Sequence, residues 1–277
     1  MSYSGGWFVI WGGGGGKRPY RQPCYNPPTM VKLDLHYVEP RLVDLYDIEN
    51  PRGADTDFYV QLAAELDART ILDLGCGTGL FTRELAMVDG RTVLGVDPAS
   101  AMLAYARRQP GAEQVRWVEG TSKRLGTPQA DLLIMTSHVA QVFLDDAKWD
   151  DTLRDIYKAL RPGGTLAFES RNPVYEGWKR WNREDSFFRY ESPHGLMETW
   201  VEVVGVGNGR VHFQGHNIFT ATGEKLVVDS KLRFRTQAEL TSSLQNAGFT
   251  IEHLYGNWDR SPFLPTSPEM IFVARRN

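Results

Sequence analysis

The fold of this chain is decided by the stretch ILDLGCGTG, which occupies residues 71–79. Its first four residues are mostly apolar, as in a strand buried on both faces, and its last five are rich in glycine. A helical pattern follows at about 80–87. Gly75 and Gly77 permit a tight turn and let a ligand approach the backbone without meeting a Cβ atom. We therefore predict a strand, a turn and a helix whose free N–H groups favour an anion.

An acidic residue lies at the distance that a nucleoside pocket requires. A second apolar strand at 92–97 ends on Asp97, eighteen residues after Gly79. A carboxylate there can accept hydrogen bonds from both ribose hydroxyls. A plain strand-to-helix turn would explain the glycines but not the acid that accompanies them. The sequence thus predicts an adenosine-type pocket at the carboxyl edge of the sheet.

The pattern continues outward as a doubly wound α/β domain. Apolar runs alternate with helical patterns, which indicates a parallel sheet covered by helices on both faces. The expected strands are 70–74, 92–97, 115–119, 131–136, 165–169, 250–255 and 270–274, and the expected helices are 58–66, 80–87, 99–107, 151–160 and 237–247.

The alternation stops between the fifth strand and the last helix. Residues from about 195 to 235 show strand patterns separated by glycine-containing turns. We expect 174–235 to be a small antiparallel β lid, inserted into a main domain made of 30–173 and 236–277.

Composition excludes several classes of protein. Of 277 residues 42% are apolar and 23% are charged, and the net charge is −3. Nucleic acid is not an expected partner, because its binding normally needs a basic domain. No apolar run approaches the roughly 20 residues of a membrane span. Two cysteines fit a reducing, cytoplasmic setting. Residues 1–29 hold seven of the 27 glycines and no acidic residue, so we expect a flexible tail.

The glycine turn also indicates which nucleotide binds. The glycine motif of dinucleotide-binding folds needs glycine at position 80, where this chain has Leu80. A nicotinamide-dependent oxidoreductase is therefore the least favoured hypothesis. The pattern DxGxGxG at 73–79 instead resembles motif I of the class I S-adenosylmethionine-dependent methyltransferases. The stretches at 93–98, 119–121 and 160–164 resemble further motifs of that family. The resemblance covers about 58–173 and 236–277, and it implies a seven-stranded, Rossmann-like sheet.

The resemblance also implies how S-adenosylmethionine binds as cofactor. The glycines would follow its methionine part and ribose, Asp97 would hold the ribose hydroxyls, and the turn after the third strand would meet adenine. Thr121 departs from the aspartate of many members, which leaves a backbone contact there. The implied cofactor-binding residues are Asp73, Gly75, Gly77, Gly79, Asp97, Pro98, Met102, Gly120, Thr121, Thr136 and Ser137, with Tyr46 and Tyr59 either covering the methionine end or packing.

Methyl transfer from a sulfonium depends on alignment more than on covalent help. A base is useful where the acceptor loses a proton. His138 follows the fourth strand at the ligand-binding edge, so it is the candidate base; capping a helix or bonding the cofactor are its alternative roles. The candidate substrate contacts are Gln141, Arg171, Trp178 and Trp258.

No metal site is expected. His212 and His216 are four residues apart, but in a strand that spacing separates them by about 13 Å. The acidic run at 145–151 is expected to be a solvated loop and helix start.

The sequence therefore predicts methyl transfer from S-adenosylmethionine to a nitrogen or oxygen of a small-molecule acceptor. Lids of this kind resemble those of small-molecule N-methyltransferases, including ones acting on amino sugars. Aromatic and basic residues interleave at 178–190 and could stack on bases, so an RNA or protein methyltransferase is the alternative. A protein that binds S-adenosylmethionine without catalysis is the second alternative.

Overall fold

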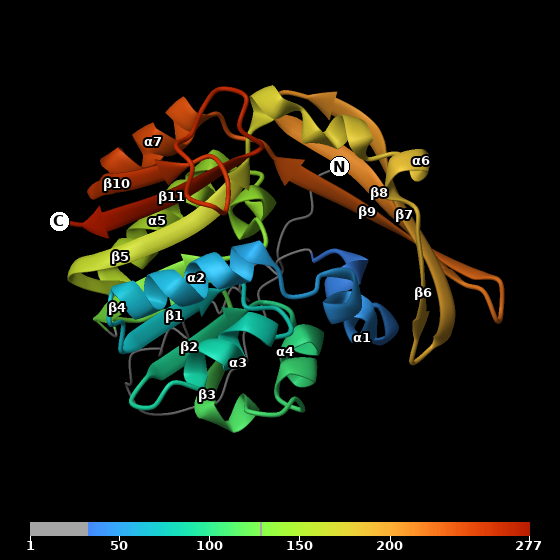
Figure 1. Ribbon diagram of the computed structural model, residues 1–277, viewed down its shortest axis with the longest axis horizontal. Helices are drawn as coiled ribbons and strands as arrows, with labels where there is room; N and C mark the ends of the chain where they lie inside the picture. Colours follow the sequence, from blue (N-terminus) through green and yellow to red (C-terminus); the bar gives the residue numbers. More distant parts are fainter. Residues whose placement is uncertain (1–32, 128) are drawn as a thin grey trace, which may run out of the picture. The chain divides into compact units, whose positions relative to one another are not determined.

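The computed structural model describes residues 33–127 and 129–277, so the predicted tail at 1–29 lies outside the described residues. The described chain forms two sheets (Figure 1). One is the predicted seven-stranded sheet, and the other is a four-stranded antiparallel sheet inserted after its fifth strand. Both parts of the predicted fold class are confirmed.

The core sheet has the strand order β10-β11-β5-β4-β1-β2-β3. The chain starts with β1 at the centre, adds β2 and β3 on one side and then places β4 and β5 on the other. Because all these pairs are parallel, the carboxyl ends of β1 to β5 lie at one edge of the sheet. β11 runs antiparallel to β5 and therefore begins at that same edge. The strands are β1 (Thr70–Leu74), β2 (Thr92–Asp97), β3 (Val115–Glu119), β4 (Ala130–Met135), β5 (Leu160–Arg171), β10 (Phe249–Tyr255) and β11 (Glu269–Arg276).

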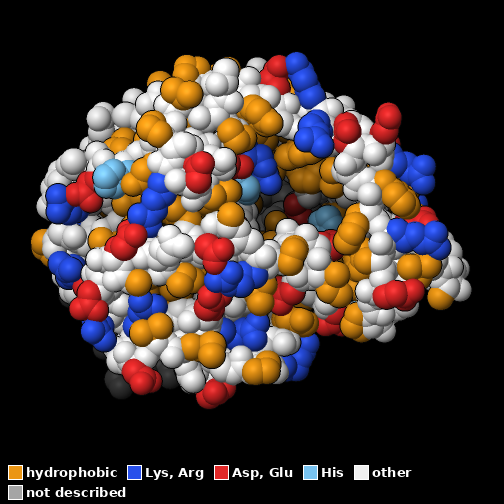
Figure 2. All heavy atoms as spheres, in the orientation of Figure 1, with side chains coloured by type: hydrophobic (Ala, Val, Ile, Leu, Met, Phe, Trp, Pro, Cys, Tyr) orange, Lys and Arg blue, Asp and Glu red, His pale blue; other side chains and the backbone are white. Residues whose placement is uncertain are grey.

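The inserted sheet has the order β6-β7-β8-β9, with every pair antiparallel. Its strands are β6 (Phe188–Ser192), β7 (Gly195–Gly207), β8 (Arg210–Phe219) and β9 (Glu224–Arg233), preceded by the short helix α6 (Arg183–Ser186). The helix α1 (Pro40–Glu49) packs Leu42 and Leu45 against this sheet. Between the inserted sheet and the carboxyl edge of the core sheet the molecular surface is hollowed, and Figure 2 shows acidic, basic and histidine side chains in and around the hollow.

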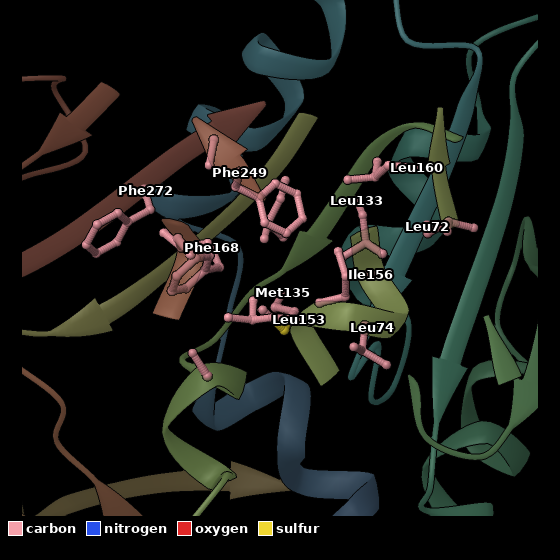
Figure 3. Packing of buried hydrophobic residues seen from close by; sticks show 14 of the residues in the cluster. Leu72, Leu74, Leu133, Met135, Leu153, Ile156, Leu160, Phe168, Phe249 and Phe272 are labelled. Atoms are coloured by element: carbon pink, nitrogen blue, oxygen red, sulfur yellow. The ribbon is translucent and has the colours of Figure 1, made fainter. Parts of the chain in front are cut away.

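Helices cover both faces of the core sheet because its strands alternate apolar residues to either side. Leu72 belongs to one cluster with α5 and α7, whereas its neighbour Ile71 belongs to the other with α2 and α3. Figure 3 shows Ile156 of α5 beside Leu133 of β4, and Leu153 beside Met135, in the first cluster. The helices are α2 (Ala54–Glu65), α3 (Leu80–Ala86), α4 (Ser100–Ala106), α5 (Asp146–Ala159) and α7 (Gln237–Asn246).

Several elements differ from the sequence-based expectation. α1 was not predicted. α5 begins at Asp146 rather than about 151, because the acidic run forms its first turn and Asp145 caps it through the Lys148 N–H at 3.0 Å. β5 extends back to Leu160, and β6 gives strand structure to part of the aromatic and basic stretch. None of the helices described is long and apolar enough to cross a membrane.

Candidate active site

The candidate site lies at the carboxyl edge of the core sheet, beginning with the glycine turn between β1 and α3. Gly75, Gly77 and Gly79 all have positive φ, which an L side chain rarely adopts. A Cβ on Gly75 would meet Val139 at 2.5 Å, and one on Gly79 would meet Trp117 at 2.2 Å. A Cβ on Gly77 would meet nothing within 4 Å. Two of these glycines therefore serve packing, while Gly77 presents open backbone to a ligand.

Asp97 lies directly beside this turn. It accepts the Gly77 N–H at 2.9 Å on one carboxylate oxygen and the Ala99 N–H at 2.7 Å on the other. Burial raises the pKa of this carboxyl, although both backbone hydrogen bonds oppose the rise. A carboxylate has about four acceptor positions, so each oxygen of Asp97 keeps one for a ribose hydroxyl. The cradle thus fits the predicted nucleoside.

Asp73 lies beneath the turn with 1% of its surface exposed. It accepts the Thr82 hydroxyl at 2.6 Å, while its other oxygen has no hydrogen-bond partner among the described residues. Burial raises its pKa to about 7.

The residues predicted for the adenine end lie around β2 and β3. Pro98 is half-buried and Met102 is buried against Val43 of α1. The Gly120 N–H donates to the Asp97 carbonyl at 2.9 Å, and Thr121, half-buried, follows it. This arrangement joins the adenine side to the acid that would hold the ribose.

Two tyrosines, Tyr37 and Tyr46, lie close enough to both Asp97 and Arg171 for the charge of each to affect their pKa. The rings of Tyr37 and Tyr46 are 6.3 Å apart. Burial, with the nearby charge of Asp97, raises the pKa of Tyr46 to about 12, and the charge of Arg171 opposes this. Tyr37 has the same two charged neighbours and was not singled out in the sequence.

The predicted base, His138, lies in a polar cluster at the ends of β4, β5 and β11. Its backbone N–H donates to Glu169 at 2.6 Å, and its Nε2 lies 3.0 Å from Glu269 Oε2. Glu169 also accepts the hydroxyl of Tyr59, and burial raises the pKa of this carboxyl. Tyr59 therefore supports the histidine loop through Glu169.

The backbone at this point is unusual. Ser137 and His138 have φ values of +53° and +62°, a left-handed conformation that is uncommon outside glycine. Such strain persists only where the surrounding structure fixes it, and it is frequent at functional sites. The Thr136 carbonyl, predicted to face the cofactor ammonium, accepts the Val139 N–H at 3.3 Å. The side-chain contacts of His138 hold this turn in place.

The predicted substrate contacts fall into two groups. Arg171 donates to Gln141 Oε1 at 3.0 Å. Because Gln141 is fully buried, it positions the arginine and does not reach a substrate itself. Trp178 packs edge-on against Phe234, with ring centroids 4.7 Å apart, and borders a groove of about 440 Å³ on the inserted segment. Trp258 packs against Phe58 and Tyr59, behind the polar cluster.

Sequence reasoning missed Glu169 and Glu269. Both lie inside or beside apolar runs that predict strands, which hid them among core residues. One signal was available: a final antiparallel strand must begin at the ligand edge, so its first residue, Glu269, faces the site region.

Comparison with known proteins agrees with this architecture. Residues 71–164 match the family described as methyltransferase domain. The demethylmenaquinone methyltransferase of Deinococcus radiodurans is 33% identical over 165 residues, which cover 55% of this chain and 68% of that protein. The chain belongs to the class I S-adenosylmethionine-dependent methyltransferases.

Other relatives of this methyltransferase have names that give different substrates. The malonyl-[acyl-carrier protein] O-methyltransferase of Pectobacterium atrosepticum is 32% identical over 133 residues, 46% of this chain, and the chain spans 50% of that relative's length. The sugar N-methyltransferase KedS8 from Streptoalloteichus has a TM-score of 0.66 at 19% identity, covering 95% of this chain and 100% of that one. That likeness shows a shared fold.

Proposed function

We propose that this protein transfers the methyl group of S-adenosylmethionine to a nitrogen or oxygen atom of a small molecule. One observation carries the proposal: the Glu269–His138 pair lies at the same sheet edge as the open backbone of Gly77 and the carboxylate of Asp97. A nucleoside cradle and an oriented imidazole are the two parts that such a reaction needs. The names of the relatives support small-molecule acceptors without selecting one.

Gly77 and Asp97 would hold the ribose, and the turn at Gly120 and Thr121 would meet the adenine. Bound S-adenosylmethionine supplies a methyl group made electrophilic by the positive sulfur. The chain's own task is to place an acceptor atom in line with the methyl–sulfur bond, which can contribute several kcal/mol, about 7–11 in the best cases.

His138 can receive a proton from the acceptor. Because Nε2 faces the Glu269 carboxylate, Nε2 carries the hydrogen and Nδ1 is left with its lone pair. The acceptor's lone pair forms a bond to the methyl carbon, the methyl–sulfur bond breaks, and the acceptor proton passes to Nδ1. The imidazolium that results is stabilised by Glu269.

The inserted sheet would act as the lid over this reaction. It is joined to α1 through Leu42 and Leu45, and Gly215 of β8 lies so close to His36 that a Cβ there would meet the ring at 2.7 Å. These contacts tie the sheet to the segment that carries Tyr37 and Tyr46. A closed site excludes water and strengthens the electrostatic interactions inside it.

The test begins with calorimetry of S-adenosylmethionine, S-adenosylhomocysteine and NAD. We expect micromolar binding of the two sulfur compounds and none of NAD. Transfer of a labelled methyl group to a panel of small amines, alcohols and acids would then be compared between the wild type and His138→Gln. Binding of NAD, or of neither sulfur compound, would overturn the proposal; cofactor binding with no transfer to any acceptor class would favour a non-catalytic role.

A further inference from the structure

Arg171 at the end of β5 is a half-buried cation without an ionic partner in the described part of the chain. No carboxylate oxygen of the described residues lies within 4.0 Å of its guanidinium nitrogens. The buried arginines of β9 and the segment after it contrast with it: Arg233 pairs with Glu239 at 2.7 Å and Arg235 with Asp146 at 2.9 Å. Removing a charge from water costs free energy unless the charge is paired. Arg171 has no such pair among the described residues, and this difference from Arg233 and Arg235 indicates that a ligand supplies the negative charge.

Its guanidinium is nevertheless held in a fixed orientation. Nη1 donates to Gln141 Oε1 at 3.0 Å, and the guanidinium lies over the ring of Trp181, 5.4 Å from its centroid. These two contacts leave most of its five N–H donors without an acceptor among the residues that the structure describes. None of its nitrogens is both buried and unpaired, so the remaining donors keep access to solvent.

The carboxylates nearby are engaged elsewhere. Glu269 is the register partner of Arg171 on β11, but its Oε2 faces His138. Glu169 accepts hydrogen bonds from Tyr59 and His138. Burial lowers the pKa of the Arg171 guanidinium, and the charges of the two glutamates only partly offset this. An anion at the open side would meet N–H donors that no residue within 33–127 or 129–277 accepts from.

Such an anion could belong to the methyl acceptor or be the methionine carboxylate of the cofactor, and the position of Arg171 favours the acceptor. In the sheet order, β4 separates β5 from β1, so Arg171 lies about 10 Å across the sheet from the strand that leads into the glycine turn. His138 follows β4, and its side chain reaches Glu269 of β11, the strand beyond β5, so the imidazole lies on the Arg171 side of the cradle. An anion at Arg171 is thus beside the candidate base and away from the strand that leads into the cofactor cradle, where the acceptor belongs.

We infer that Arg171 binds a carboxylate or phosphate group of the methyl acceptor, so that the acceptors of this enzyme are anionic small molecules. A guanidinium matches the planar geometry of carboxylate and phosphate through two parallel hydrogen bonds. The inference rests on the proposed function and narrows its substrate class.

The experiment uses the full chain saturated with S-adenosylhomocysteine, titrated with acetate, inorganic phosphate or acetamide at constant ionic strength. Binding is measured by the thermal unfolding midpoint and by NMR shifts. We expect acetate or phosphate to saturate and acetamide, the neutral analogue of acetate, not to. Arg171→Gln should weaken binding of the anion roughly tenfold or more, since the substitution removes a charged hydrogen-bond donor.

Two variants complete the design. Arg171→Lys keeps the charge but loses the paired donors, so its affinity should fall between wild type and Arg171→Gln, and it carries the test if Arg171→Gln does not fold. Arg154→Gln, on the exposed face of α5, is the matched control and should bind like wild type. Equal anion binding in all variants, or none in wild type, would overturn the inference.

One more result would overturn it. It combines competition of S-adenosylhomocysteine with acetate for the protein and a tenfold loss of affinity for S-adenosylhomocysteine in Arg171→Gln. If both are observed, the guanidinium binds the methionine carboxylate and not the acceptor. Failure of the proposed function itself is distinguishable, because wild type would then bind no S-adenosylhomocysteine.

Discussion

The Nε2 atom of His138 lies 3.0 Å from Glu269 Oε2, although 131 residues separate them along the chain. The antiparallel β11 makes this contact possible, because it starts where the parallel strands end. A histidine held by a carboxylate through one ring nitrogen is prepared to act as a base through the other. The closing hairpin of the sheet therefore contributes to the site and not only to the core.

This pairing predicts that Glu269 and His138 act as a unit. Glu269→Gln should lower kcat about 10- to 100-fold and leave the affinity for S-adenosylhomocysteine unchanged, because the effect passes through the base. His138→Gln should lower it further, within the 10²- to 10⁴-fold range of general bases. The double variant should be no slower than His138→Gln alone.

Rates of methyl transfer from the single and double variants would check this prediction. Glu252→Gln, which removes an exposed ion pair with Arg275 on the neighbouring hairpin strand, is the control. Fully additive losses would show that the two residues act independently.

Asp97→Asn should weaken S-adenosylhomocysteine binding about 10- to 100-fold. The amide replaces one acceptor oxygen by an NH₂ group that faces the backbone donors and the ribose, and a hydrogen bond to a charged group contributes about 1.5–3 kcal/mol. Calorimetry measures the loss. Asp150→Asn, an exposed residue of α5, should bind like wild type. Unchanged affinity in Asp97→Asn would mean that the ribose lies elsewhere.

Gly77→Ala should mainly reduce the affinity for the cofactor, whereas Gly79→Ala should mainly reduce the stability of the fold. The new Cβ at position 77 enters open space, so the variant should fold with a moderate loss of stability from its φ of +53° but bind the cofactor poorly. The new Cβ at position 79 would lie 2.2 Å from Trp117, so that variant should lose about 1–3 kcal/mol of stability or more. Thermal unfolding and calorimetry on both variants separate the two effects. A similar pair of losses in each would contradict the assignment of open and packed glycines.

The sequence was sufficient for the core sheet, and it also predicted a glycine turn with an acid beside it, because both depend on local patterns. Apolar strands, glycine turns and the acid at position 97 are read from neighbouring residues. α1 was missed because its apolar residues serve two separate surfaces: Leu42 and Leu45 face the inserted sheet, while Val43 faces α4. Glu169 and Glu269 were missed because their role depends on strand order, which places β5 and the C-terminal strand β11 beside each other and brings both glutamates to His138. Long-range pairing of this kind leaves little local trace.

Asp73 predicts a pH-dependent stability in the protein without cofactor. Its pKa rises from 3.8 to about 7 on folding because it is buried, so the folded state holds a proton that the unfolded state has lost between these values. The contribution of Asp73 to stability therefore falls with rising pH across this window, by about 1.4 kcal/mol per unit. Asp73→Asn cannot ionise and still offers an oxygen to Thr82. Its stability relative to wild type should increase by about 2.5 kcal/mol between pH 5 and pH 7.5 and then level off. Urea unfolding at several pH values measures this, and Asp131→Asn is the control: the pKa of Asp131 is lowered, so that variant's difference from wild type should stay constant over the same range. A constant difference for Asp73→Asn as well would show that Asp73 is ionised in the folded protein at pH 5, with a counter-charge beside its unpaired oxygen.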